Sequence, residues 1–197
     1  MAKIIVFGGS FDPVHNAHIE MAELVNISFA PSKIIFVPAF LAPHKMCHFA
    51  PAADRVEMLK IALKNIPNVE INLYEMKQET KIYSYQTLDY FKSCYPKDEI
   101  LMIIGSDALL SLSTWKNIDY IVKNYRFVVA KRKDVVITPQ TKFLDRCLFI
   151  DKEIDNVSST QIRNLVRSKK FLSNYLNKEV YNYIINHGLY SSENNNP

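Results

Sequence analysis

Glycine is scarce in this sequence, with 4 among 197 residues. The glycine-rich phosphate loops G-x-G-x-x-G and G-x-x-x-x-G-K-[ST] are both absent, which excludes the nucleotide-binding classes that depend on them. Two of the four glycines nevertheless stand side by side, Gly8 and Gly9, directly after the apolar run at residues 4–7. A glycine pair at that place lets a ligand approach the backbone closely.

Cysteine and long apolar runs are also scarce. The three cysteines show no C-x-x-C spacing, so we expect neither a disulfide framework nor a cysteine metal site. No segment approaches the roughly 18 uninterrupted apolar residues of a membrane helix, and the N-terminus enters a strand instead of a signal-peptide pattern. The net charge of +4 is dispersed, and no RNA-recognition motif is present. We therefore expect a cytoplasmic protein with no membrane or nucleic-acid partner.

Short β-branched runs alternate with stretches of helical periodicity along the chain. The runs predict strands at 4–7, 33–38, 69–74, 99–105, 126–130 and 147–150. This alternation predicts the α/β class, with a doubly wound, Rossmann-like, mostly parallel sheet and helices on both faces. Ligands of such sheets bind outside the carboxyl ends of the strands. We expect C-terminal helices to complete a single domain over residues 1–190, followed by a disordered tail at 191–197.

The segment GGSFDPVHNAH at residues 8–18 follows the first predicted strand. Asp12 is expected to cap a helix that starts directly after it, which places the glycine pair before a helix N-terminus suited to an anion. His15 and His18, three residues apart, are expected on one face of that helix, where both can reach the same phosphate. The alternative is a glycine turn before an exposed helix with two incidental histidines. A metal site would need a third ligand, and none is evident.

This segment resembles the signature G-[GS]-[TS]-F-D-P-x-H-x-G-H of the HxGH class of nucleotidyltransferases, which includes adenylyltransferases and cytidylyltransferases. It departs at Ala17, where the class has glycine; the added methyl group concerns nucleotide affinity and not the reaction class. The resemblance implies ATP phosphate binding at Gly8, Gly9, Ser10 and Phe11, and catalytic roles for His15 and His18.

The segment VSSTQIR at residues 157–163 offers a second anion site. Ser158 and Ser159 can cap a helix, and Arg163 adds a forked cation one turn further on. Taken alone, it reads as an ordinary surface helix with a solvated arginine. It is similar to the motif I-S-S-T-x-I-R of nicotinate and nicotinamide mononucleotide adenylyltransferases. That likeness implies ATP binding at Ser158, Ser159 and Thr160 and a catalytic Arg163.

The segment PAFLAPHK at residues 38–45 resembles the P-x-x-x-x-P-H-K of the same family. The resemblance directs His44 and Lys45 at phosphates, with Lys45 among the catalytic residues. As an isolated segment, a proline-bounded loop with a basic pair could equally be plain surface.

Two further segments resemble the pyridine-binding part of this family. IIGSDALLSLSTW at 103–115 resembles I-I-G-x-D-x-L-x-x-L-x-x-W, while a lone tryptophan on an amphipathic helix is otherwise more often core. The segment at 82–88 matches S-Y-T-x-D-T-L in part, with Ile82 and Gln86 in place of serine and aspartate, and this difference bears on the choice between acid and amide substrates. The implied pyridine nucleotide-binding residues are Ser84, Gly105, Asp107, Ser111 and Trp115.

The residues alone indicate phosphate chemistry in an α/β crevice. The resemblance implies a nicotinate-nucleotide adenylyltransferase that transfers AMP from ATP to nicotinate mononucleotide in NAD biosynthesis. Mg²⁺ would be bound through the ATP phosphates, without a metal site on the protein. The alternatives are a nicotinamide mononucleotide adenylyltransferase, another HxGH transferase such as phosphopantetheine adenylyltransferase, and a non-catalytic nucleotide-sensing module. A monomer and a homo-oligomer both stay open.

Overall fold

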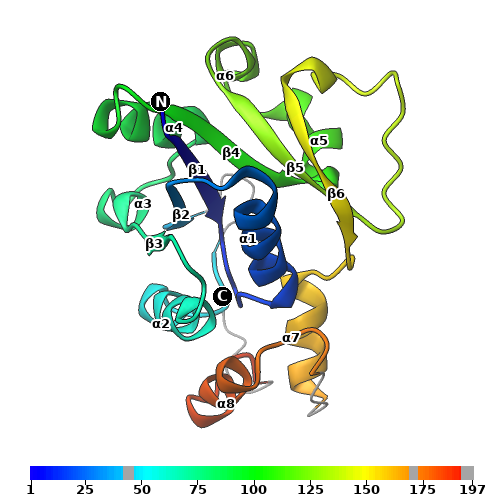
Figure 1. Ribbon diagram of the computed structural model, residues 1–197. Helices are drawn as coiled ribbons and strands as arrows, with labels where there is room; N and C mark the ends of the chain where they lie inside the picture. The colour runs from blue at the N-terminus through cyan, green and yellow to red at the C-terminus, as the bar shows by residue number, and fades with distance from the viewer. Residues whose placement is uncertain (42–46, 169–172, 192–197) are drawn as a thin grey trace.

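The computed structural model describes residues 1–41, 47–168 and 173–191, and within them the chain forms one six-stranded sheet, seen in Figure 1. Every strand pair in it is parallel, which confirms the predicted α/β class. The strands are β1 (Lys3–Gly9), β2 (Lys33–Pro38), β3 (Val69–Ile71), β4 (Glu99–Gly105), β5 (Arg126–Arg132) and β6 (Cys147–Ile154).

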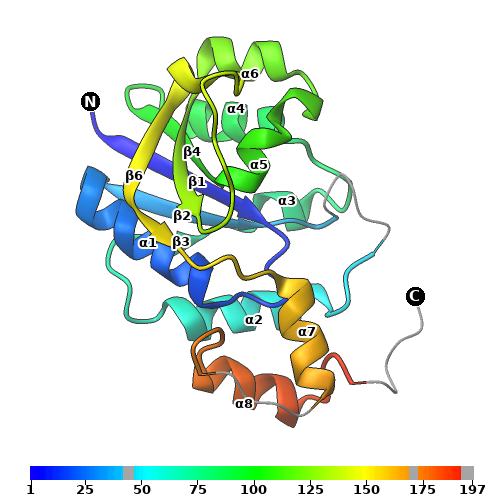
Figure 2. The ribbon, with the colours of Figure 1, turned by 90° about the vertical axis from the view of Figure 1, so that its right-hand side faces the viewer.

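Helices cover both faces of the sheet. Figure 2 shows α1, α2, α7 and α8 on one side and α4, α5 and α6 on the other. The described helices are α1 (Asn16–Phe29), α2 (Ala52–Leu63), α3 (Tyr74–Lys77), α4 (Ser84–Cys94), α5 (Ser106–Leu110), α6 (Ile118–Asn124), α7 (Ser159–Arg167) and α8 (Lys178–Asn186). Searched over the same described residues, no helix has the length and apolar character needed to cross a membrane.

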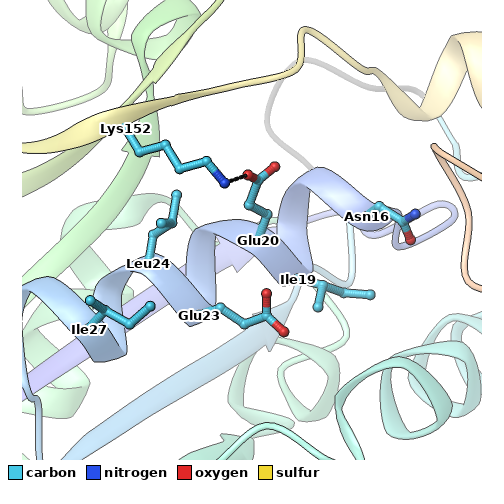
Figure 3. Close-up of a pocket in the computed structure, with 7 residues that line it drawn as sticks. All are labelled: Asn16, Ile19, Glu20, Glu23, Leu24, Ile27 and Lys152. Atoms are coloured by element: carbon cyan, nitrogen blue, oxygen red, sulfur yellow. Dashed lines mark hydrogen bonds and ion pairs between the residues drawn. The ribbon is translucent and has the colours of Figure 1, made fainter.

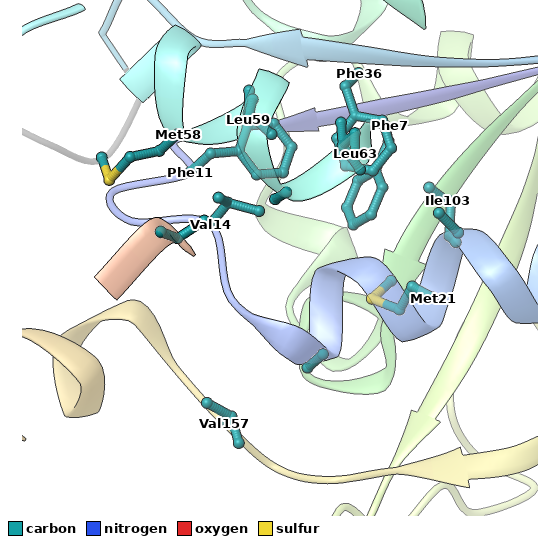
Figure 4. Packing of buried hydrophobic residues seen from close by; sticks show 14 of the residues in the cluster. Phe7, Phe11, Val14, Met21, Phe36, Met58, Leu59, Leu63, Ile103 and Val157 are labelled. Carbon is teal, nitrogen blue, oxygen red and sulfur yellow. The ribbon is translucent and has the colours of Figure 1, made fainter. Parts of the chain in front are cut away.

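Helices on both faces of the sheet explain why the strands are apolar along their whole length. In β1, Ile5 and Phe7 pack into the core shared with α1 and α2, whereas Ile4 and Val6 pack into the core shared with α4 and α6. All four are at most 5% exposed, as expected for a parallel strand buried on both faces. Figure 4 shows the first core, where Phe7 meets Phe36 of β2 with ring centroids 4.8 Å apart.

The strand order β3-β2-β1-β4-β5-β6 reverses direction between β1 and β4. In doubly wound sheets, ligands bind at this switch point, outside the carboxyl ends of the strands. The segment after β1 and the end of β4 both lie at this edge, so the sheet brings together two of the segments singled out in the sequence.

Some predicted boundaries were wrong. β3 ends at Ile71 because Asn72 starts the turn into α3, where its Oδ1 accepts from Tyr74 N at 2.9 Å. β6 runs on to Ile154 with exposed charged side chains, which its position at the sheet edge permits. The division at residue 190 stays a prediction, because residues 192–197 lie outside the described residues.

The expected capping role of Asp12 was also wrong. α1 begins at Asn16 with His15 as its N-cap residue, and Asp12 lies in the preceding loop. Its carboxylate is fully buried and accepts hydrogen bonds from Phe49 N (2.8 Å), Ala50 N (3.1 Å) and Tyr190 Oη (2.8 Å). Burial alone would raise the pKa of Asp12, but the His48 imidazole 3.6 Å away and the hydrogen bonds from Phe49, Tyr190 and Ala50 lower it to about 2. Asp12 therefore joins the first motif to the end of the chain.

Candidate active site

A cleft of about 800 Å³ opens at the carboxyl ends of β1 and β4. It collects residues from both the expected phosphate segment and the expected pyridine segment. Seven of the predicted site residues line it: Gly8, Gly9, Ser10, Ser84, Asp107, Ser111 and Trp115. This cleft is therefore the candidate active site.

The backbone at the rim of this cleft is crowded. A Cβ atom on Gly9 would lie 2.9 Å from the Phe11 ring, which is itself in the core and 1% exposed. Phe11 can therefore offer a ligand its backbone but not its side chain. A Cβ atom on Gly105 would lie 2.4 Å from Asp107 Oδ1 and 2.8 Å from Arg132 Nε. Gly105 thus makes room for the contact between these two side chains and is not itself part of the cleft wall.

The two histidines lie together, as the sequence predicted. Their rings stack with centroids 3.7 Å apart, and His15 N–H donates to His18 Nδ1 at 3.2 Å. A neutral imidazole has one donor and one acceptor nitrogen, so this bond places the proton of His18 on Nε2. His15 is buried and His18 is partly exposed.

Both histidines are uncharged at neutral pH. Burial, and then the charge of Arg132, lowers the pKa of His15 from 6.5 to about 3. Burial, followed by the effects of His15 and Arg132, also lowers the pKa of His18 well below 6.5. In the free protein the pair therefore offers N–H donors to an anion and no net positive charge.

These pKa shifts predict that acid destabilises the fold. The unfolded chain binds a proton at His15 below pH 6.5, whereas the folded chain does so only near pH 3, so stability falls as pH drops below 6.5. The slope for His15 should approach about 1.4 kcal/mol per pH unit. We expect the slopes of unfolding free energy against pH, measured in urea between pH 7.5 and 5, to differ by this amount between the wild type and His15→Asn, because Glu75, whose raised pKa acts in the opposite direction, titrates in both proteins. Equal slopes in the two proteins would contradict the buried neutral state.

Arg132, at the end of β5, is a site residue that sequence reasoning missed. Its Nε lies 2.9 Å from Asp107 Oδ1, and its Nη1 donates to Val157 O at 2.8 Å. It therefore fixes Asp107 at the cleft and connects β5 to the start of the second motif. The available signal was a basic residue close to the carboxyl end of a predicted strand, which belongs to the same edge as the other site segments.

The second motif packs directly against the first. Ser158 caps α7 by accepting from Gln161 N at 3.3 Å, as predicted, and Ser159 Oγ donates to Pro13 O at 2.9 Å. Arg163 donates to Asp12 O at 2.7 Å.

The alternative of a solvated surface arginine was wrong. Arg163 is 6% exposed, its Nη2 donates to Thr160 Oγ1 at 3.0 Å, and its guanidinium lies 4.0 Å above the Phe49 ring. Burial lowers its pKa, which the negative charge of Asp12 partly offsets.

Trp115 packs on the core and also reaches the cleft. Its ring meets Phe127 edge-on at 6.3 Å in the second core, and the same side chain lines the cleft. Ser84 begins α4 after the N-cap Tyr83, and Gln86 Oε1 accepts from Tyr83 N at 3.0 Å. Gln86 therefore keeps the helix cap that an aspartate would form, although it departs from the family pattern.

His44 and Lys45 lie outside the described residues. Phe49 and Ala50, which follow them, are held by Asp12 as described above.

A different hollow lies on the outer face of α1, beside β6 (Figure 3). It contains Glu20, which pairs with Lys152 at 2.8 Å, and also Glu23. Of the motif residues, only Asn16 at the start of α1 lines this hollow. The carboxylates of Glu20 and Glu23 disfavour a phosphate ligand there.

Comparison with known proteins agrees with this geometry. The cytidylyltransferase-like family matches residues 6–165. A protein of Endomicrobium trichonymphae named probable nicotinate-nucleotide adenylyltransferase is 53% identical over 193 residues, covering 96% of this chain and 100% of the relative. A protein of Caldicellulosiruptor saccharolyticus with the same name is 34% identical over 195 residues, covering 95% of this chain and 98% of the relative. The Plasmodium falciparum nicotinic acid mononucleotide adenylyltransferase complexed with NaAD has the same fold, with a TM-score of 0.82 at 20% identity over 96% of this chain and 98% of that one.

Proposed function

The chain belongs to the cytidylyltransferase-like family and, within it, to the nicotinate-nucleotide adenylyltransferases, and from this membership we propose that it transfers AMP from ATP to nicotinate mononucleotide. The products are deamido-NAD and pyrophosphate, in NAD biosynthesis. One observation carries the proposal: the switch-point cleft has a phosphate-type segment at one end and Trp115 with the start of α4 at the other. We place the reaction in the cytoplasm, and a monomer and a homo-oligomer both stay open.

The reaction is a displacement at phosphorus. A phosphate oxygen of the mononucleotide attacks the α-phosphorus of ATP in line, the bond to the oxygen bridging the α- and β-phosphates breaks, and pyrophosphate leaves with that oxygen. No protein base is needed because the attacking phosphate is already ionised at neutral pH. Catalysis then consists of positioning and of stabilising charge that develops in the transition state.

We assign the following roles to the site residues, of which Lys45 lies outside the described residues. His18 Nε2–H and His15 donate to phosphate oxygens of ATP, together with the backbone of the glycine pair. The N-terminus of α7, with Ser158, Ser159 and Thr160, faces the departing phosphates, and Arg163 and Lys45 stabilise them. Arg163 uses two of its five N–H groups on Asp12 O and Thr160, so donors remain for a ligand.

The site fits a magnesium ion that is bound to the substrate ATP and not to protein ligands. Among the described residues, no group of three or more His, Cys, Asp or Glu side chains could hold a metal ion. The cleft carboxylate of Asp107 is already paired with Arg132. Mg²⁺ would therefore be held by the ATP phosphates, where it neutralises their charge.

The pyridine end of the cleft favours a carboxylate. The first N–H groups of α4, at Ser84 and Tyr85, have no acceptor within the helix, and Trp115 offers a ring to stack on. Asp107, paired with Arg132, lines the same cleft, and we assign it to the ribose hydroxyls. Backbone donors suit the acid better than the amide, whose NH₂ would face N–H groups and leave a donor unpaired at a cost of about 1 to 3 kcal/mol.

We therefore expect nicotinate mononucleotide to be preferred over nicotinamide mononucleotide by about 5- to 150-fold in kcat/KM. Pyrophosphate release with ATP and each mononucleotide measures this ratio, with phosphopantetheine as a third acceptor. Equal efficiencies or a preference for the amide would contradict the assigned substrate. ATP binding without any turnover would favour a nucleotide-sensing module.

A further inference from the structure

Glu75 is a buried acid in the wall of the cleft that the proposed reaction does not use. It lies in the short helix α3 and is 7% exposed. It lines the same cleft as Ser84 and Trp115, the residues assigned to the pyridine. A buried carboxylate is costly unless it is paired and hydrogen-bonded, and without a partner it tends to take up a proton.

Glu75 makes one hydrogen bond and no ion pair with the described residues. Thr87 of α4, 1% exposed, donates from Oγ1 to Glu75 Oε1 at 2.6 Å. No described residue forms an ion pair with Glu75 or a hydrogen bond with its Oε2. The other acid of the cleft wall, Asp107, differs in this respect because Arg132 neutralises it.

The carboxyl group of Glu75 titrates near neutral pH. Burial raises its pKa from 4.5 to about 7, and the Thr87 hydrogen bond opposes part of that rise. Other titratable or charged groups around it are Tyr74 on α3, Tyr83 at the start of α4, Arg55 of α2, which reaches Met76, and Asp107 and Lys116 on the cleft wall. A test of Glu75 must therefore separate its ionisation from the ionisation of these neighbouring groups.

We propose that Glu75 determines which pyridine mononucleotide the cleft accepts. In its neutral form it tolerates the negative substituent of nicotinate mononucleotide, and in its ionised form it repels that substituent while leaving the uncharged amide unaffected. The physical basis is like-charge repulsion in a desolvated cleft, where a charge is poorly screened. The inference rests on the proposed function, because it concerns the same two substrates.

The ratio of kcat/KM for the acid over the amide, measured from pH 6 to 8.5, tests this proposal. Ionisation of the shared substrate phosphate, and of the histidines, affects both substrates alike and cancels in the ratio. For the wild type we expect the ratio to fall about 10-fold across this range. For Glu75→Gln, whose amide oxygen can still accept from Thr87, we expect a high ratio that does not change with pH.

Two further variants complete the experiment. Thr87→Val removes a hydrogen bond that favours the ionised acid, so the midpoint of the fall should move to higher pH, and this variant serves also if Glu75→Gln does not fold. Glu79→Gln, an exposed residue on the turn after α3, should behave like the wild type. A wild-type ratio independent of pH, or one that still falls in Glu75→Gln, would overturn the role of Glu75. Absence of turnover with both mononucleotides would instead overturn the proposed function.

Discussion

His18→Ala is expected to lower kcat by about 10²- to 10³-fold while the protein stays folded. The imidazole is a donor fixed in place by His15 N–H and by the stacked ring of His15. Removing one such donor from a site of developing charge typically has an effect of this size. The comparison is single-turnover adenylyl transfer at saturating ATP, with circular dichroism and urea unfolding as measures of the fold.

A matched control is available on the surface. His187 at the end of α8 is exposed and also stacks on another ring, that of Tyr183 at 4.0 Å. His187→Ala should therefore leave kcat unchanged. If folded His18→Ala also retains the wild-type rate, the histidine pair does not act on the phosphates.

Arg163→Lys is expected to weaken both the fold and catalysis. Lysine keeps the charge but loses the planar fork that reaches Asp12 O and Thr160 and packs on Phe49. A lost hydrogen bond to a buried acceptor lowers the free energy of unfolding by about 1 to 3 kcal/mol. The first and second motifs would also shift relative to each other, and a misplacement of about 1 Å can lower kcat/KM for ATP by about 10²-fold.

Arg167, one turn further along α7, provides the control. It is exposed and lies 5.9 Å from the Phe49 ring, so Arg167→Lys should change ATP kinetics and stability far less. A loss of stability in Arg163→Lys without any change in ATP kinetics would restrict Arg163 to a structural role.

Much of the fold follows from local patterns. The β-branched runs predict the parallel strands because a strand buried on both faces must be apolar throughout, as Ile4 to Phe7 are. The cap of α7 follows from Ser158 and Gln161, which lie three residues apart. The spacing of His15 and His18 likewise predicts that they meet, since residues three apart are neighbours at a helix start.

The missed features depend on partners distant in sequence. Asp12 looks like a helix cap until Phe49, Ala50 and Tyr190, up to 178 residues away, are seen to use its carboxylate. Arg132 and Glu75 show no motif in their own segments. The role of Arg132 depends on its contact with Asp107, and that of Glu75 on a cleft lined by residues from several elements. Local periodicity cannot report such contacts, since they exist only after the sheet assembles.

The most direct test of the central claim is identification of the product by mass spectrometry after incubation with ATP labelled at the α-phosphate and nicotinate mononucleotide. We expect deamido-NAD that carries the label in its AMP half, formed in a one-to-one ratio with unlabelled pyrophosphate. Folded protein that binds ATP but yields no labelled dinucleotide would contradict the proposed adenylyl transfer.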